Sequence, residues 1–277
     1  SIVRQETSAM DTYFRTHEEG ERRMGKAVTD IALKKKLEHF VRETAQNSAD
    51  AAVDGDTPHL IYRYVKIEDR LDEFLNAINW PELEEHYAAV AQEDDEIGVQ
   101  RILDRIEKGS LPILIVEDRN AEGLTGDEFS KETNYASLLQ DFGSSTKDED
   151  EGGVHGVGAS VLWGFSGLKT ALFLSNPDGW EKAQSPRFVG RVDLPYHESG
   201  GEEWQGDGWI GEKSDSDKRA TSIKGQEALD IVSDELGLSF VEDRLGSTGT
   251  TAIVLGFREP NRSRRSPSKV INRIREM

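Results

Sequence analysis

Three polar residues recur at helical spacing between residues 43 and 51, and their side chains suit metal binding and water activation. Glu43, Asn47 and Asp50 stand at positions i, i+4 and i+7. At about 100° per residue they lie within about 60° of one helical stripe. A carboxylate base beside a neutral oxygen ligand suits water activation next to Mg²⁺, which prefers oxygen ligands. Taken alone, the segment fits a solvated helix face about equally well.

A second segment, Gly152-Gly-Val-His-Gly-Val-Gly-Ala-Ser160, is rich in glycine. It does not match a P-loop, because Ala159 stands where that motif requires lysine. It also fails as a dinucleotide fingerprint, because Val161 replaces the third glycine. Closely spaced glycines before a helix that begins near Gly158 leave backbone N–H groups free to bind an anion. The segment therefore predicts a phosphate-binding loop in preference to a plain flexible loop.

Two single residues are weaker signals. Asp118 follows a continuous apolar run, residues 111–116, and precedes a turn that contains Gly123. A carboxylate fixed at a strand end can accept a hydrogen bond from an exocyclic amine such as that of adenine, but aspartate before such a turn is also ordinary turn chemistry. Thr250 precedes the last expected strand, where threonine is common in any case.

The elements that must position these residues can be read from apolar spacing. The polar stripe belongs to a helix capped by Thr29 or Asp30, with an expected apolar face of Ile31, Leu33, Leu37, Phe40, Val41, Ala45, Ala49 and Ala52. Further helices are expected near residues 71–78, 102–106, 159–167 and 226–236, and strands at 60–65, 111–116, 170–175, 188–194 and 251–255. Residues 197–225 are expected to form a loop. Strands and helices without regular alternation indicate the α+β class.

Composition limits the classes of function. The net charge of −19, from 34 Lys+Arg and 53 Asp+Glu, disfavours nonspecific binding to nucleic acid. The absence of cysteine excludes disulfides and thiolate metal sites, and no apolar run is long enough for a membrane span. We therefore expect a cytoplasmic protein without membrane contact, whose 277 residues can form a sizeable core.

The order of the motifs carries more information than any one of them. A Glu-x-x-x-Asn-x-x-Asp-Ala helix, an Asp followed by Gly after a buried strand, a Gly-Gly-x-x-Gly-x-Gly loop before a helix and Gly-Thr before a strand resemble the GHKL ATPases, such as gyrase, heat-shock chaperone, histidine kinase and mismatch-repair ATPases. The resemblance spans about residues 31–254. It implies a Bergerat-type two-layer α/β sandwich, in which a mixed, mostly antiparallel sheet is covered on one face by helices.

The resemblance also implies a domain organisation. Residues 1–27 would form an N-terminal arm, residues 28–257 the ATP-binding domain, and residues 258–277 a basic tail or the start of a following segment. The tail is more readily explained as a solvated helix than as a partner-binding segment. Within the domain, residues from about 119 to 158 would form a lid that orders on ATP and Mg²⁺.

Site roles follow from the same resemblance. Glu43 would be the general base, Asn47 would hold Mg²⁺, and Asp50 would be a supporting acid. The adenine amino group would bind Asp118, with Thr250 supporting Asp118 through its hydroxyl. Gly123 would shape the turn that lies against the adenine ring. The phosphates would be bound by Gly153, Val154, His155, Gly156, Val157 and Gly158, with Lys147 adding positive charge from the lid.

The chain departs from the family pattern at two places. Asn120 replaces the first glycine of the usual Asp-x-Gly-x-Gly turn, and Gly123 comes one residue late. Because asparagine tolerates positive φ, we expect the turn to persist in modified form. Ala159 replaces a lysine found in bacterial and archaeal members with a similar Asp-x-x-x-x-Gly-Leu-Thr-Gly signature, some of which occur in defence-type operons.

The expected function is slow, Mg²⁺-dependent hydrolysis of ATP to ADP and phosphate that drives a conformational switch. A defence or DNA-related system is one expected setting, with a partner protein. ATP would bring two copies together as a homodimer, with the N-terminal arm as the candidate exchanged element. Two alternatives stay open: a nucleotide sensor that does not hydrolyse ATP, and a protein or nucleic-acid interaction module that uses the basic tail and the loop containing Trp204 and Trp209.

Overall fold

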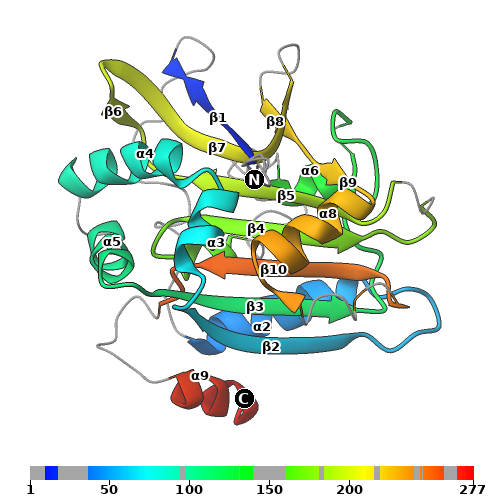
Figure 1. Ribbon diagram of the computed structural model, residues 1–277. Helices are drawn as coiled ribbons and strands as arrows, with labels where there is room; N and C mark the ends of the chain where they lie inside the picture. Colours follow the sequence, from blue (N-terminus) through cyan, green and yellow to red (C-terminus); the bar gives the residue numbers. More distant parts are fainter. Residues whose placement is uncertain are drawn as a thin grey trace, which may run out of the picture.

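An antiparallel β-sheet forms the centre of the computed structural model (Figure 1). The structure describes residues 10–17, 37–93, 98–130, 132–139, 160–180, 184–214, 219–239, 244, 246–258 and 267–277. Within these residues the sheet has ten strands, with the main order β1-β7-β5-β4-β10-β3-β2, and every strand pair is antiparallel. The α+β class is confirmed, and the sheet is antiparallel rather than mixed where it is described.

The expected strands are present with small changes in their ends. The strands are β1 (Asp11–Thr16), β2 (His59–Ile67), β3 (Leu111–Arg119), β4 (Thr170–Asn176), β5 (Arg187–Asp193), β6 (His197–Ser199), β7 (Glu202–Ser214), β8 (Arg219–Thr221), β9 (Ile223–Lys224) and β10 (Gly249–Leu255). The helices are α2 (Leu37–Asp50), α3 (Leu71–Ala77), α4 (Trp80–Glu93), α5 (Val99–Glu107), α6 (Asn134–Leu139), α7 (Val161–Gly164), α8 (Gln226–Asp230), the π-helix η3 (Ile231–Glu235) and α9 (Pro267–Arg275).

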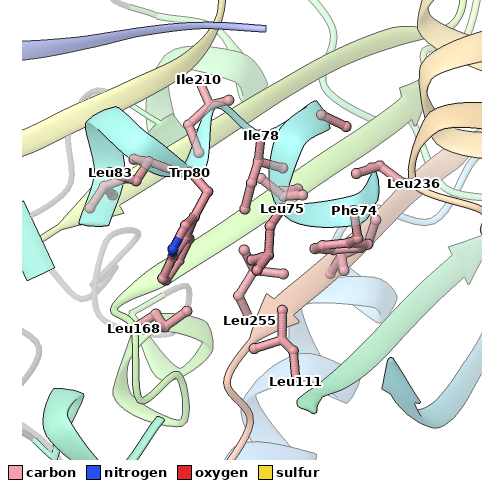
Figure 2. Close-up of a cluster of buried hydrophobic side chains, with 14 of the residues drawn as sticks. Phe74, Leu75, Ile78, Trp80, Leu83, Leu111, Leu168, Ile210, Leu236 and Leu255 are labelled. Atoms are coloured by element: carbon pink, nitrogen blue, oxygen red, sulfur yellow. The ribbon is translucent and has the colours of Figure 1, made fainter. Parts of the chain in front are cut away.

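Helices cover both faces of the sheet, which corrects the expectation of one covered face. On β3, Ile113 and Ile115 belong to one buried cluster, whereas Leu114 and Val116 belong to another. The first cluster includes residues of α3, α4, α5, α8 and η3, and Figure 2 shows Phe74 and Leu75 of α3, with Ile78 just after it, packed there. Because residues 71–107 supply three helices with apolar sides, a second sheet face is needed to bury them. The arrangement has three layers rather than two.

The second cluster contains α2, α6, α7 and α9. The C-terminal helix is not the solvated helix that was expected, because Val270 and Ile274 are only 5% and 9% exposed. These two residues are four positions apart and so lie on one helix face, which packs near β2 and α2. The same helix carries Lys269, Arg273 and Arg275, so the composition of the segment does not reveal its buried side.

Two segments in which no strand was expected contribute strands. Part of the N-terminal arm is β1, which pairs with β7 of the same chain. The expected loop at residues 197–225 contains β6, β7, β8 and β9. Gly208 indicated a loop, yet it sits opposite Phe14 across the β1–β7 pair, and a Cβ there would approach the Phe14 ring to 2.7 Å. This glycine therefore makes room for a neighbouring ring inside the sheet.

Candidate functional site

A cavity of about 450 Å³ lies between α2 and the sheet face that α2 covers. The structure brings six of the sequence-predicted residues to its walls: Glu43, Asn47, Asp50, Asp118, Gly123 and Thr250. They come from α2, β3, the turn after β3 and β10, which are distant in sequence. Lys147 and the loop Gly153, Val154, His155, Gly156, Val157 and Gly158 lie outside the described residues, as does half of the expected lid. The described part of the lid segment contains α6, which the sequence did not predict.

Helix α2 turns its polar stripe toward the cavity because small polar residues occupy part of its buried side. Thr44 and Ser48 are buried together with Leu37 and Phe40. Ala45 and Ala49 were expected on the apolar face but are exposed. The Thr44 hydroxyl lies 2.6 Å from the Tyr62 hydroxyl of β2 and donates to the Phe40 carbonyl at 2.9 Å. These bonds satisfy the threonine and hold α2 against the sheet.

Glu43 has basic neighbours on the same helix. Its Oε1 accepts a hydrogen bond from Arg42 Nη2 at 3.0 Å and lies 3.5 Å from His39 Nδ1. The side chain of Glu43 is 18% exposed, whereas that of Arg42 is 69% exposed. The carboxylate is thus held in place at the cavity wall while still open to solvent, as a base that acts on water must be.

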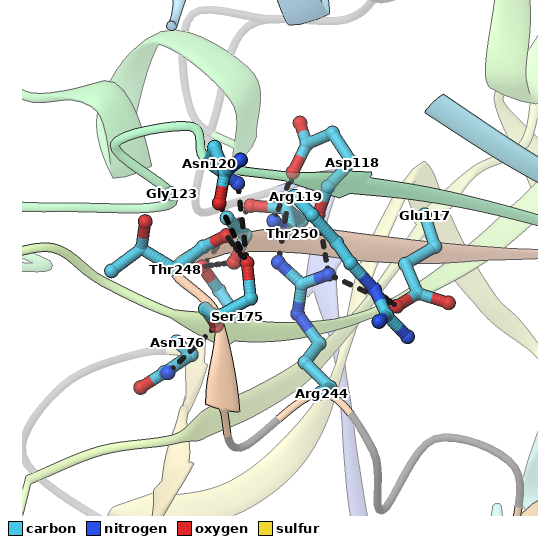
Figure 3. A network of polar contacts seen from close by, with 12 residues as sticks. Glu117, Asp118, Arg119, Asn120, Gly123, Ser175, Asn176, Arg244, Thr248 and Thr250 are labelled. Carbon is cyan, nitrogen blue, oxygen red and sulfur yellow. Dashed lines mark hydrogen bonds and ion pairs between the residues drawn. The ribbon is translucent and has the colours of Figure 1, made fainter. Parts of the chain in front are cut away.

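Asp118 is fixed at the end of β3 by groups from two other segments (Figure 3). Its Oδ1 accepts from the backbone N–H of Thr250 and lies 3.6 Å from Arg244 Nη2. Burial raises the pKa of Asp118, while Arg244 and the Thr250 amide act in the opposite direction. The expected support from the Thr250 hydroxyl is not observed, because that hydroxyl lies 3.1 Å from Ser175 Oγ instead.

The turn after β3 has left-handed backbone at the two positions where the chain departs from the family pattern. Asn120 has φ of 59° and Gly123 has φ of 73°. Asn120 thus has the positive φ that was expected of an asparagine in this turn. A Cβ on Gly123 would approach Ser175 Oγ to 2.8 Å, so this position requires glycine for space as well as conformation. Ser175 Oγ accepts from the Leu124 N–H at 2.8 Å and donates to the Gly249 carbonyl at 3.1 Å, which ties the turn to β4 and β10.

The far side of this turn is anchored by a buried ion pair. Arg187 of β5 is fully buried, and its Nη2 lies 2.9 Å from Glu128 Oε1. Its Nη1 donates to the carbonyls of Leu124 and Gly126, both at 3.0 Å. The guanidinium also lies over the ring of Tyr135 on α6, at 3.9 Å from its centroid. One arginine thus fixes the cavity-lining turn and α6 to the sheet.

Sequence reasoning missed Ser175, Glu117 and Arg244. Ser175 is opposite Thr250 in the β4–β10 register, a relation that only the paired strands reveal. Glu117 ends the apolar run of β3 and is fully buried, with ion pairs to Arg63, Arg119 and Arg244. A glutamate directly after an apolar run was the sequence signal that could have identified Glu117 as a buried, paired carboxylate. Arg244 lies in a polar segment where no pattern singles it out.

The chemistry of the cavity combines apolar walls with oxygen groups. The apolar part comes from Leu60, Val116, Leu138, Leu162, Phe173 and Ala252. Four carboxylates line it, those of Glu43, Asp50, Asp118 and Glu122, and no lysine or arginine is among its lining residues in the described ranges. The described residues also contain no group of three or more His, Cys, Asp or Glu side chains arranged to hold a metal. A hard cation that takes one or two protein oxygens and otherwise water or phosphate fits this donor set.

Comparisons with protein-family models and with curated protein sequences gave no match. Among the described residues, no helix has the length and apolar character needed to cross a membrane.

Proposed function

We propose that this cavity binds ATP together with Mg²⁺ and hydrolyses the nucleotide. The observation that carries the proposal is the convergence of Glu43, Asn47 and Asp50 with Asp118, Gly123 and Thr250 around one cavity. The motif order predicts these residues to act together, and a coincidental set of polar residues would have no reason to meet. The volume of the cavity is also in the range of small-molecule sites.

The apolar walls and Asp118 support adenine recognition. A purine ring can pack against Val116, Phe173 and Ala252, while its exocyclic amine donates to the Asp118 carboxylate. Because Gly123 carries no side chain, the backbone can approach the base closely. A bound purine would exclude water from the apolar walls, so the one polar contact would contribute strongly to selectivity.

Asn47, with Asp50 nearby on the same helix, would hold Mg²⁺ through side-chain oxygens. When bound, Mg²⁺ supplies positive charge that offsets the negative charge of the phosphates in a cavity lined by four carboxylates. Glu43 would orient a water molecule and take its proton, since its carboxylate is both held by Arg42 and open to solvent. Slow turnover would then act as a timer for a conformational switch, and ATP-dependent dimerisation stays a prediction.

The test of catalysis is phosphate release by the wild type and by Glu43→Gln. We expect the substitution to lower the rate by roughly 10²–10⁴-fold while ATP affinity is retained, because only the base is lost. Glu38→Gln is the matched control, since Glu38 is on the same helix and 58% exposed, and its ion-pair partner is Arg273. Equal, nonzero rates for the wild type and Glu43→Gln would remove Glu43 from the mechanism. ATP binding without any phosphate release would select the sensor alternative.

A further inference from the structure

Arg244 is a buried cation that lies directly against Asp118, the carboxylate to which we assign adenine recognition. Its side chain is 1% exposed. Its Nη1 donates to the Asp118 backbone carbonyl, and its Nη2 lies 3.6 Å from Asp118 Oδ1 (Figure 3). The same guanidinium lies 3.7 Å from Glu117 Oε1. Burial lowers the pKa of Arg244 to about 10, which leaves it charged at neutral pH.

The other charged groups around Asp118 mostly oppose its ionisation. Glu117 is its neighbour on β3 and raises its pKa. Across the cavity, α2 presents Glu43 and Asp50, and the turn presents Glu122. On β2, the residue opposite Asp118 is the apolar Leu60. Arg63 of β2 and Arg119 of β3 are paired with Glu117.

The backbone makes room for this contact. Gly249, at the start of β10, has φ of 124°. A Cβ on Gly249 would stand 2.4 Å from Asp118 Oδ1 and 2.6 Å from Arg244 Nη2. Glycine is therefore required for Arg244 and Asp118 to meet beside the end of the strand.

We propose that Arg244 is a positioning residue that keeps Asp118 an ionised hydrogen-bond acceptor and thereby sets the preference of the cavity for an amino-bearing purine. The proposal rests on the proposed function, because it concerns the same cavity. An ionised carboxylate only accepts hydrogen bonds, whereas a protonated one also donates. Arg244 also holds the Asp118 backbone, so its charge and its geometry act on the same residue.

The experiment compares the affinity for ATP with the affinity for purine riboside triphosphate, which is ATP without the 6-amino group. The proteins are the wild type, Arg244→Lys and Arg244→Gln, titrated at several pH values. We expect the wild type to prefer ATP by roughly tenfold to hundredfold, as for a hydrogen bond to a charged group. Arg244→Lys should keep most of this preference and Arg244→Gln should lose most of it.

The pH profile separates this role from a merely structural one. Burial has already raised the pKa of Asp118, and removal of the cation raises it further, so ATP affinity should begin to fall at a higher pH in Arg244→Gln than in the wild type. The lysine variant should shift this pH back toward the wild-type value. Arg63→Gln is the matched control, because it removes another arginine that forms an ion pair with Glu117.

The outcomes are distinct. Equal preference and equal pH profiles in the lysine and glutamine variants would overturn the role of Arg244 while leaving ATP binding intact. Absence of ATP binding by the wild type would overturn the proposed function itself. If Arg244→Gln does not fold, Arg244→Met provides the second test, because it keeps a side chain of similar length without the charge. Arg244→Met should lose the preference, and a full wild-type preference would contradict the proposal.

Discussion

At the scale of single residues, one buried hydroxyl of the cavity wall lacks a hydrogen-bond partner within the part of the chain that the structure describes. Ser48 is 4% exposed, and its Oγ has no hydrogen-bond partner among the described residues. Thr44, one turn earlier on α2, is buried to a similar extent but is fully bonded. An unsatisfied buried hydroxyl destabilises the free protein, and a ligand in the cavity would supply its partner.

This contrast gives a prediction for the two α2 hydroxyls. Ser48→Ala should leave the free energy of unfolding unchanged or raise it slightly, because an unsatisfied group is removed. Thr44→Val should lower it by about 1–3 kcal/mol, because the Tyr62 hydroxyl loses its partner. Urea denaturation of both variants measures the difference. A larger loss of stability in Ser48→Ala than in Thr44→Val would contradict the assignment.

At the scale of elements, the predictable parts are those whose signal is local. The apolar run of β3 and the polar stripe of α2 are readable because burial on one element fixes their residue types. Strand β7 was not predicted, since the neighbours that require its glycines lie on other segments: Gly208 faces the Phe14 ring and Gly211 faces the Thr221 carbonyl. Helix α9 was taken as solvated because its buried partners lie on distant elements. In the site, Asp118 was predicted from its own position, but Ser175 and Arg244 depend on contacts between segments.

A pair of histidines joins α4 to the β6–β7 hairpin. His86 Nδ1 lies 2.8 Å from His197 Nε2, and His197 Nδ1 lies 2.9 Å from the Pro195 carbonyl. Burial lowers the pKa of both rings and keeps them neutral, so His197 donates from Nδ1 to that carbonyl and its Nε2 accepts from His86. The Phe14 ring of β1 stacks on His86 with centroids 3.7 Å apart, so three elements meet at this pair.

The pair predicts a loss of stability in mild acid. Burial and the nearby His197 lower the pKa of His86 to about 3, and burial also lowers the pKa of His197, although Pro195 and Glu93 act in the opposite direction. Well above pH 6.5 the two histidines are neutral in both the folded and the unfolded state, so their contribution to the stability of the fold is fully present. As pH falls below about 6.5, the unfolded chain binds protons that the folded chain does not, which removes up to about 1.4 kcal/mol per pH unit for each histidine.

Thermal melting between pH 7.5 and 4 measures this effect. His86→Gln should give a shallower decrease of Tm with pH, whereas His59→Gln, at an exposed position of β2, should keep the wild-type slope. Identical slopes in all three proteins would show that the buried pair does not control acid stability.

At the scale of the whole molecule, charge and topology together define the site. A chain of net charge −19 repels a polyanion, and the described cavity walls add four carboxylates. ATP should therefore bind only with a divalent cation. Helices on both faces of the sheet bury most of the apolar residues of the strands. The cavity lies where the polar stripe of α2 faces the C-terminal end of β3 and the start of β10.

The most direct test of the account is isothermal titration calorimetry of ATP, with and without Mg²⁺, on the wild type and on Asp118→Asn. We predict one ATP bound per chain in the presence of Mg²⁺, and at least roughly tenfold weaker binding by Asp118→Asn. The amide oxygen of the asparagine would accept from the Thr250 N–H, which leaves its NH₂ group to face the donor amine of adenine. Absence of ATP binding by the wild type, or equal binding by Asp118→Asn, would contradict the account.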